Sequence, residues 1–174
     1  MNYAEIKKND VANGPGVRVS LFVSGCRHHC KGCFNEEAWD FNYGKEFNNK
    51  VEDEIIEALS HDYIRGLTLL GGEPFEAENQ RRLLPFLKRV KAIYPEKDIW
   101  AFTGFLFDEE LQKESRARCE VTDEMLSLID TLVDGRFKID KKDLSLVFRG
   151  SKNQRIIDVK ESLHQNKIVF SKYN

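Results

Sequence analysis

Short apolar stretches typical of strands alternate with amphipathic stretches typical of helices along this chain. The strand-like stretches are residues 17–23, 67–70, 99–102 and 131–134. Apolar residues at helical spacing follow the first three of them, in residues 51–59, 83–90 and 125–129. Such alternation predicts an α/β fold with a mainly parallel sheet and helices packed on it. A complete eightfold barrel takes about 250 residues, so a chain of 174 residues favours a partial, open (β/α) barrel.

Two parts of this pattern are less regular. Pro85 interrupts the helical spacing of residues 83–90, so we expect that helix to be kinked or to begin late. Residues 146–150 and 167–172 are partly apolar but fit neither period clearly, and they are left unassigned.

Each predicted strand runs directly into a loop of unusual composition. The four loops begin with SGC at 24–26, GGEP at 71–74, TGF at 103–105 and DGRF at 134–137. Parallel strands present their carboxyl ends at one edge of the sheet, and folds of this kind build their sites at that edge. We therefore expect the four loops to form a single site, although they are far apart in the sequence.

The composition is that of a soluble globular protein, with 41% hydrophobic and 32% charged residues. No run of about 18 apolar residues occurs, so a transmembrane helix is not expected. The first ten residues, MNYAEIKKND, contain no apolar run, and we expect no secretory signal. These observations predict a cytoplasmic protein. Clustered cysteines in the reducing cytosol indicate metal binding or catalysis rather than disulfides.

Positive charge is concentrated towards the C-terminus. The net charge is −2, yet residues 136–174 contain ten Lys and Arg against four Asp and Glu. A basic region of this kind can dock an acidic partner or a phosphorylated ligand, although a solvated surface with a local bias is the simpler interpretation. No nucleic-acid-binding motif is present, so nucleic acid is not an expected partner.

Three of the four cysteines lie within eight residues of one another, in SGCRHHCKGCFN at 24–35. A structural zinc site takes four ligands, commonly as two pairs from separate segments. His28 and His29 lie in a loop too short to turn either ring easily back onto a metal, so we expect both to be solvated loop residues. A c-type haem needs CxxCH, which Phe34 excludes. A thioredoxin-like pair would leave Cys26 without a role.

An iron–sulfur cluster fits the three clustered thiols of Cys26, Cys30 and Cys33. Soft thiolates select such clusters, and a four-iron cluster normally takes four of them. Three ligands leave one iron with an open coordination position, and an open position is what distinguishes catalytic from structural metal sites. Cys119 stands apart in RARCEV and is most simply a lone structural or surface thiol. The predicted metal ligands are therefore the three clustered cysteines, and we predict no catalytic residue beyond them.

The spacing C-x3-C-x2-C after the first strand, with GGEP after the second, resembles the radical S-adenosylmethionine superfamily. The resemblance implies that the three cysteines hold a 4Fe-4S cluster, whose open iron is chelated by the amino and carboxylate groups of S-adenosylmethionine. In that superfamily the backbone of the glycine-rich loop contacts the methionyl amino group, and glycines allow such close approach. Taken alone, GGEP would be an ordinary tight turn. By the resemblance, the residues that bind S-adenosylmethionine are Gly32, Cys33, Phe34, Gly71, Gly72 and Glu73.

A narrower resemblance is to the activating proteins of anaerobic ribonucleoside-triphosphate reductase. The shared elements are NGPG, C-x3-C-x-G-C-(F/Y)-N, KDIW with a following TG, V-D-G-(R/K)-(F/Y) and RGSxNQ, here at 13–16, 26–35, 97–104, 133–137 and 149–154. Gly32 replaces the aromatic residue that many superfamily members have there, which weakens the match to pyruvate formate-lyase activating enzymes. GGEP stands where relatives often have GGDP and keeps the glycines and the carboxylate. The resemblance extends from Asn2 to about Ile157.

The resemblance also implies an activity and its partners. An electron donor such as flavodoxin or ferredoxin reduces the cluster, which then cleaves S-adenosylmethionine into methionine and a 5′-deoxyadenosyl radical. That radical abstracts a Cα hydrogen from one glycine of the large subunit of the anaerobic reductase and leaves a stable glycyl radical. The protein supplies orientation and shielding, because the cofactors carry the difficult chemistry. We expect a single domain of this type over residues 1–174, with about 158–174 as a C-terminal extension of uncertain structure.

Other residues near the predicted edge have less specific roles. Thr103 and Asp134 favour turn or capping roles over ligand contact. Trp39, Trp100 and the phenylalanines are expected in the core. Candidates for docking the reductase, or equally for fastening the C-terminal region, are Arg149, Asn153 and Gln154.

Two alternative functions remain open. One is another radical S-adenosylmethionine enzyme, similar to pyruvate formate-lyase activase or, for a small-molecule substrate, to 7-carboxy-7-deazaguanine synthase. A small-molecule enzyme needs extra segments to close a substrate pocket, and this chain has little length to spare. The other alternative is a non-catalytic module with zinc on the cysteines.

Overall fold

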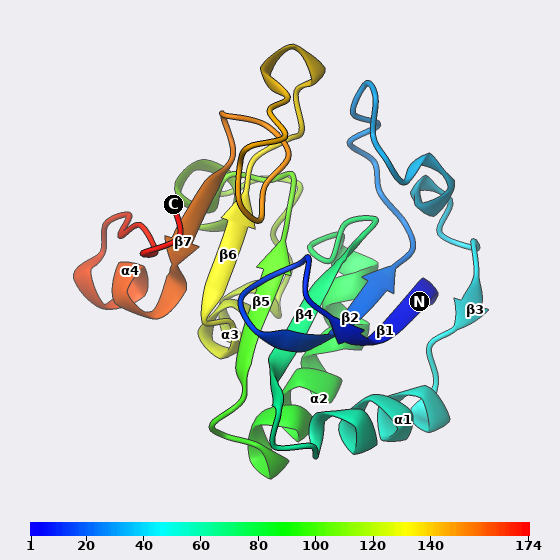
Figure 1. Cartoon of the computed structure of the whole chain (residues 1–174). Helices are drawn as coiled ribbons and strands as arrows, with labels where there is room; N and C mark the ends of the chain where they lie inside the picture. The colour runs from blue at the N-terminus through cyan, green and yellow to red at the C-terminus, as the bar shows by residue number, and fades with distance from the viewer.

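A seven-stranded sheet forms the centre of the computed structural model, which describes residues 1–174 (Figure 1). The strands are β1 (Asn2–Asp10), β2 (Val17–Val23), β3 (Lys45–Glu46), β4 (Ile64–Gly71), β5 (Asp98–Phe102), β6 (Thr131–Asp134) and β7 (Arg155–Asp158). The α-helices are α1 (Asn49–Leu59), α2 (Ala77–Ile93), α3 (Thr122–Leu128) and α4 (Val159–Gln165). Short helical turns cover Glu36–Trp39, Phe107–Leu111 and Ile139–Lys141. None of the helices combines the length and apolar character needed to cross a membrane.

The sheet is mixed, with the order β3-β1-β2-β4-β5-β6-β7. Its four central strands β2, β4, β5 and β6 are parallel, and they contain the four predicted strands. β1 pairs antiparallel with β2 and β3, and β7 pairs antiparallel with β6. The expectation of a mainly parallel sheet is therefore wrong, because both ends of the sheet are antiparallel. The sheet is open, as expected, but a barrel is not confirmed.

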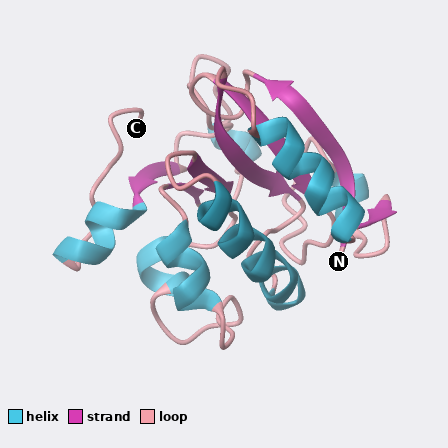
Figure 2. Cartoon of the chain, turned by 90° about the horizontal axis from the view of Figure 1, so that it is seen from below, coloured by secondary structure: helices cyan, strands magenta, loops and turns pink.

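Alternate residues of the central strands face two different environments. One set, including Leu21, Leu69 and Ala101, packs with helices α1, α2 and α3 in a core of 31 buried residues. These helices lie together on that face of the sheet (Figure 2). The opposite face carries a smaller cluster of Trp100, Val133 and Ile156, against which Phe102, Phe148 and Tyr173 pack.

Helix α2 passes through Pro85 without interruption. It begins at Ala77, so the expected late start is wrong. Its buried side includes Leu83, Leu84 and Leu87, which pack in the main core, and tertiary packing of this face offsets the hydrogen bond that proline cannot donate.

The carboxyl ends of β2, β4, β5 and β6 meet at one edge of the sheet, as the sequence predicts. This edge is at the top of Figure 1, where the cysteine loop and residues 136–154 stand on either side of the loop that follows β4. The arrangement brings together side chains that are far apart in the sequence.

Candidate functional site

The cysteine loop, residues 24–35, is attached to the segment that follows it. The backbone N–H of Gly25 donates to the carbonyl of Ala38 at 2.8 Å, and that of Cys26 donates to Trp39 at 3.1 Å. Farther along, the N–H of Cys33 donates to the carbonyl of Cys30 at 3.1 Å and closes a turn. All three thiols are free, with Cys26 buried and the other two half-buried.

All four predicted loops line one pocket of about 450 Å³. The cysteine loop contributes its three cysteines, and the other loops contribute Gly71 and Gly72, Thr103 and Gly104, and Gly135. The expectation that these loops meet is confirmed. Apolar side chains form much of the remaining wall, namely Phe34, Trp39, Leu70, Phe102, Phe137, Leu144, Leu146 and Phe148.

Gly71 and Gly72 are required by the close approach of two backbones. Gly71 has φ of +104°, and a Cβ on it would lie 2.7 Å from the carbonyl oxygen of Val23. A Cβ on Gly72 would lie 2.7 Å from the carbonyl oxygen of Gly25. Glycine is therefore the residue that lets the loop after β4 pack directly against the cysteine loop. Both glycines also line the pocket, so they remain in the predicted binding region.

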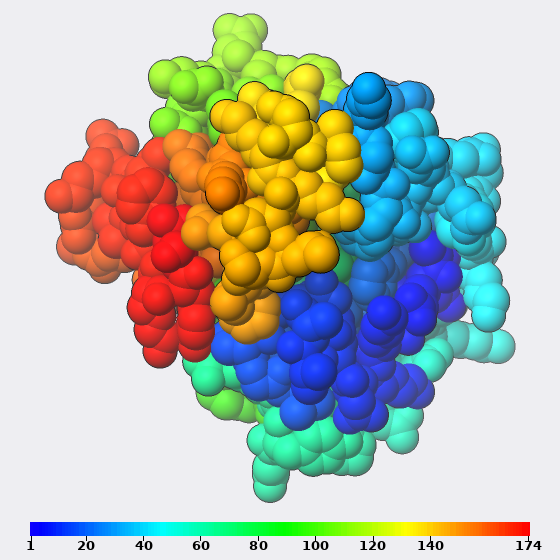
Figure 3. Space-filling view, turned by 45° about the horizontal axis from the view of Figure 1, so that its top comes forward, coloured from blue at the N-terminus to red at the C-terminus, as the bar shows by residue number.

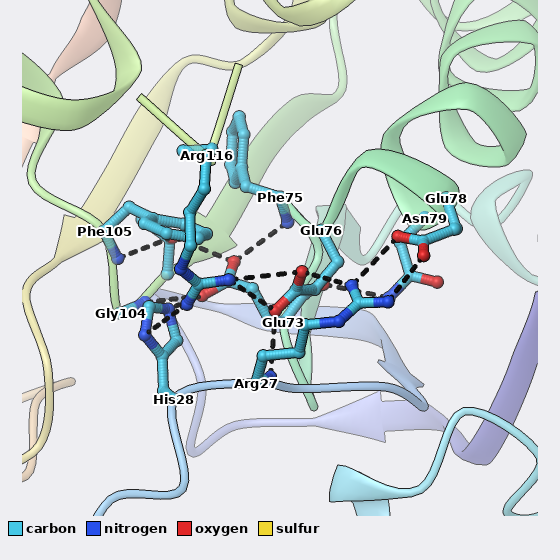
Figure 4. A network of polar contacts seen from close by, with 12 residues as sticks. Arg27, His28, Glu73, Phe75, Glu76, Glu78, Asn79, Gly104, Phe105 and Arg116 are labelled. Atoms are coloured by element: carbon cyan, nitrogen blue, oxygen red, sulfur yellow. Dashed lines mark hydrogen bonds and ion pairs between the residues drawn. The ribbon is translucent and has the colours of Figure 1, made fainter. Parts of the chain in front are cut away.

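Glu73 follows the two glycines that line the pocket and uses its whole carboxylate to join three loops (Figure 4). One oxygen accepts hydrogen bonds from the Phe75 N–H at 2.9 Å and the Thr103 hydroxyl at 2.8 Å. The other accepts from the Gly104 N–H at 2.8 Å and faces His28 Nε2 at 2.8 Å. The side chain is 1% exposed, and Glu73 is not among the residues that line the pocket.

His28 is a packed residue, so the expectation that it is a solvated loop residue is wrong. Its side chain is 3% exposed, and its ring lies edge-on to Phe105 at 4.4 Å. Arg116 approaches Nδ1 at 3.2 Å. A guanidinium can only donate, so Nδ1 accepts and Nε2 carries the proton that is donated to Glu73. His29 is exposed, as expected, and stacks on Trp39 at 4.5 Å.

A second buried carboxylate, that of Glu76, holds Arg27 of the cysteine loop (Figure 4). It accepts from the backbone N–H of Arg27 at 2.9 Å and from the guanidinium of the same residue at 2.7 Å. Arg116 contacts Glu76 as well, at 3.2 Å. Asn79 on α2 donates from its side-chain amide to the carbonyls of Ser24 and Glu73. The start of α2 thus positions the base of the cysteine loop.

Thr103 and Asp134 make the contacts expected of turn residues. The Thr103 hydroxyl accepts from the Phe105 N–H at 3.1 Å, and Thr103 also lines the pocket. Asp134 is fully buried and accepts from the Phe107 N–H at 2.8 Å and from Arg155 at 2.5 Å. Asp134 therefore fastens β7 and the loop after β5, and it does not line the pocket.

Gln154 and Asn153 fasten the chain after β6. Gln154 accepts from the Gly150 N–H at 2.9 Å and donates to the Gly135 carbonyl at 3.1 Å. Asn153 donates to the Arg136 carbonyl at 2.8 Å. Arg149 and Gln154 also line the pocket. These contacts fit the structural alternative for this segment, and docking of a partner by it remains a prediction.

Several cations of the basic region are paired within the chain. Lys152 lies 3.2 Å from Asp143, and Lys160 pairs with Asp130. Burial alone would raise the pKa of Asp130, but Lys160, the Ile99 N–H and Lys91 together lower it. Part of the predicted charge excess therefore has an internal structural role.

Trp39 and the segment 142–150 were not predicted to line a site. Trp39 is half-buried at the pocket, so the expectation of a core position is wrong, whereas Trp100 is buried as expected. Phe34 is 83% exposed and also departs from the core expectation for phenylalanines. The sequence feature that could have pointed to this segment is its group of apolar residues outside any predicted helix or strand, which include Leu146 and Phe148.

The three free thiols at one pocket fit an iron–sulfur cluster, because such clusters take soft sulfur ligands. Burial, with a smaller effect from the negative Glu73, raises the pKa of Cys26 to about 12. Burial and the neighbouring Cys33 raise the pKa of Cys30. These thiols are therefore protonated without a metal, and binding iron must displace the protons.

No three Cys, His, Asp or Glu side chains lie close enough to bind a single metal ion. A cluster needs no such convergence, because each of its thiolates binds a different iron. Cys119 does not line the pocket, and Thr122 lies beside it, with the Thr122 hydroxyl 3.7 Å from its sulfur.

Comparisons with known proteins agree with these features. The family described as "4Fe-4S single cluster domain" matches residues 12–157. The anaerobic ribonucleoside-triphosphate reductase-activating protein of Haemophilus influenzae is 48% identical over 158 residues, which is 90% of this chain and 97% of that protein. The proteins of the same name from Pasteurella multocida and Escherichia coli K12 are 46% and 44% identical, over 90% and 88% of this chain and 96% of each relative.

Proposed function

The chain belongs to the family of anaerobic ribonucleoside-triphosphate reductase-activating proteins, and from this premise we propose that it activates such a reductase by reductive cleavage of S-adenosylmethionine. The observation that carries the proposal is that the cysteine loop and the glycine-rich loop line one pocket. Three cysteines, Cys26, Cys30 and Cys33, would hold a 4Fe-4S cluster there. When bound, the cluster supplies the electron that converts S-adenosylmethionine into methionine and the 5′-deoxyadenosyl radical that takes a glycine hydrogen from the reductase.

The chain's own residues contribute positioning and shielding. Gly71 and Gly72 place the backbone of their loop against the cysteine loop, with no side chain between them. Gly32, Phe34 and the glycine-rich loop would contact S-adenosylmethionine, whereas the Glu73 carboxylate would act indirectly, by holding His28 and Gly104. The apolar wall keeps water away from a reactive radical.

Anaerobic incubation of the protein with S-adenosylmethionine, dithionite and the candidate reductase tests the proposal. We expect about four irons per chain, release of methionine and 5′-deoxyadenosine, and a glycine-centred doublet in the electron paramagnetic resonance spectrum of the reductase. Turnover of a small molecule without this doublet would favour another radical S-adenosylmethionine enzyme. Colourless, zinc-loaded protein would contradict the proposal altogether.

Exposed apolar side chains at the mouth of the pocket support a protein substrate. Leu144 lines the pocket and is 90% exposed, and Ile139, whose side chain lies beside Gly32 of the cysteine loop, is 43% exposed. In Figure 3 the atoms of residues 139–144, coloured gold, lie next to the blue atoms of the cysteine loop. We call Phe34, Ile139 and Leu144 the apolar rim. Exposed apolar side chains gathered around a pocket are typical of interaction sites.

Leu144→Ser should weaken activation of the reductase at low reductase concentration. Burial of one leucine in an interface stabilises it enough that its loss should raise the KM for the reductase roughly tenfold. Saturating reductase should restore the radical yield. The measurement is spin concentration of the glycyl radical against reductase concentration.

Ile93→Ser is the matched control, because Ile93 is 46% exposed at the end of α2, before β5 and away from the pocket. It should leave the KM for the reductase unchanged. An unchanged KM in Leu144→Ser as well would exclude a contribution of the rim.

A further inference from the structure

Residues 169–174 form a segment that runs beside β7, outside the residues 12–157 that the family description matches. The N–H of Asp158 donates to the Val169 carbonyl at 2.9 Å, and that of Ser171 donates to the Ile156 carbonyl at 2.8 Å. Ile157 and Phe170 form an antiparallel bridge between these two hydrogen bonds. The segment is therefore tied to an edge strand by regular backbone pairing, and its last two residues continue towards the pocket wall.

Tyr173 closes an aromatic group with Trp100 and Phe148. Its ring centroid lies 5.7 Å from that of Trp100 and 5.9 Å from that of Phe148, and the latter two are 5.5 Å apart. Trp100 is buried on β5, so it provides a fixed platform. Edge-to-face and tilted aromatic contacts at these distances stabilise the arrangement beyond the area they bury.

Asn174 completes the same attachment with polar contacts. Its side-chain oxygen accepts from the Ile156 N–H at 2.9 Å and from the Arg149 guanidinium at 2.8 Å. Arg149 also donates to the Gln154 carbonyl at 3.0 Å, and no carboxylate pairs with it. Asn174 is thus one of two acceptors that orient a cation with no internal counter-charge.

The two residues held in this way, Phe148 and Arg149, are consecutive and both line the pocket. Phe148 has φ of +55°, which is unfavourable for a residue with a side chain and persists only where the surroundings hold it. Regular structure in residues 138–151 is limited to the turn Ile139–Lys141 and one bridge between Lys142 and Ser151. Packing from outside the segment must therefore help to hold this part of the wall.

We propose that Tyr173 and Asn174 are positioning residues for S-adenosylmethionine binding, because they hold Phe148 and Arg149 in the wall of the pocket. The inference rests on the proposed function, since it takes S-adenosylmethionine to be the occupant. It gives residues 169–174 a structural role at the pocket, although they lie outside the matched residues 12–157.

Hydrogen–deuterium exchange of the cluster-free protein tests the support directly. In Tyr173→Ala, loss of two aromatic contacts should speed exchange of the Gly150 and Ser151 amides, which donate to Gln154, about tenfold. Amides of β4 should exchange as in the wild type, which shows that the sheet is intact. Tyr173→Phe should restore slow exchange, because the Tyr173 ring makes the contacts. Lys167→Ala, an exposed position in the same region, is the matched control.

Equilibrium dialysis of S-adenosylmethionine against the anaerobically reconstituted protein tests the consequence. The Kd should rise about tenfold in Tyr173→Ala and should stay unchanged in Tyr173→Phe and Lys167→Ala, with equal iron content in all four proteins. Failure of the wild type to bind S-adenosylmethionine would overturn the proposed function and this inference together. Binding with an unchanged Kd in Tyr173→Ala would overturn this inference alone.

Discussion

Single replacement of Cys26, Cys30 or Cys33 by alanine should abolish assembly of the iron–sulfur cluster. Each cysteine lines the same pocket, and the fourth cysteine does not. Each variant would leave the cluster with two of its three protein ligands. Loss of a group that only orients a metal ligand already lowers metal affinity about 10- to 100-fold, so loss of a ligand itself should lower it further. We therefore expect iron to fall from about four to less than about one per chain after anaerobic reconstitution.

Cys119→Ala is the matched control for these variants. Cys119 is a free, half-buried cysteine beside Thr122 at the start of α3. Its variant should match the wild type in iron content, sulfide content and colour. Iron, sulfide and visible absorption are the measurements, and circular dichroism checks that each variant is folded. Full iron content in any of the three cysteine-loop variants, or its loss in Cys119→Ala, would contradict the assignment of ligands.

The central strands could be predicted because they are buried on both faces and are apolar. Residues 131–134, for example, were predicted as a strand, and β6 has the same bounds. β1 was missed because its sequence, NYAEIKKND, is largely polar and most of its side chains are at least partly exposed. β7 has only four residues, of which two are buried. β3, which has only two residues, was missed as well. Since all three missed strands pair antiparallel, missing them led to the wrong expectation of a mainly parallel sheet.

The part of the site that could be predicted is the meeting of the four loops, because it depends only on the direction of the strands. Four loops after parallel strands had to meet, and they do. The buried position of His28 could not be predicted, because its partners Glu73 and Arg116 lie 45 and 88 residues away in the sequence. Periodicity gives no information on such pairs. The wall from Lys142 to Gly150 was missed for a related reason, since its position depends on irregular turns and on contacts with Gln154 and Asn174.

The glycine-rich loop has a second function that its composition does not reveal. Its glycines place it against the cysteine loop, and Glu73 then joins that loop to the turn after β5. The motif therefore organises the protein around the pocket as well as lining it. This joint role predicts that changes at Glu73 affect both the stability of the fold and the retention of iron.

Glu73→Gln should lower the free energy of unfolding by about 1–3 kcal/mol, because it leaves a buried donor without an acceptor. The carboxylate accepts from four donors, two at each oxygen. An amide has one oxygen, so its NH2 group must face either the Phe75 N–H or the Gly104 N–H, and neither backbone donor can reverse its role. The Thr103 hydroxyl can adapt by rotating, whereas the backbone groups cannot.

Glu78→Gln is the matched control, because Glu78 is 51% exposed and pairs with Arg27 at 2.7 Å on the surface. An exposed ion pair contributes about 1 kcal/mol or less, so this variant should unfold close to the wild type. Urea unfolding under anaerobic conditions measures the difference, and the rate of iron loss to a chelator reports on the cysteine loop. We expect faster iron loss only in Glu73→Gln, since its side chain can no longer accept from all four of the donors that join the three loops. Equal unfolding free energies and equal iron loss in the two variants would show that the carboxylate does not organise the site.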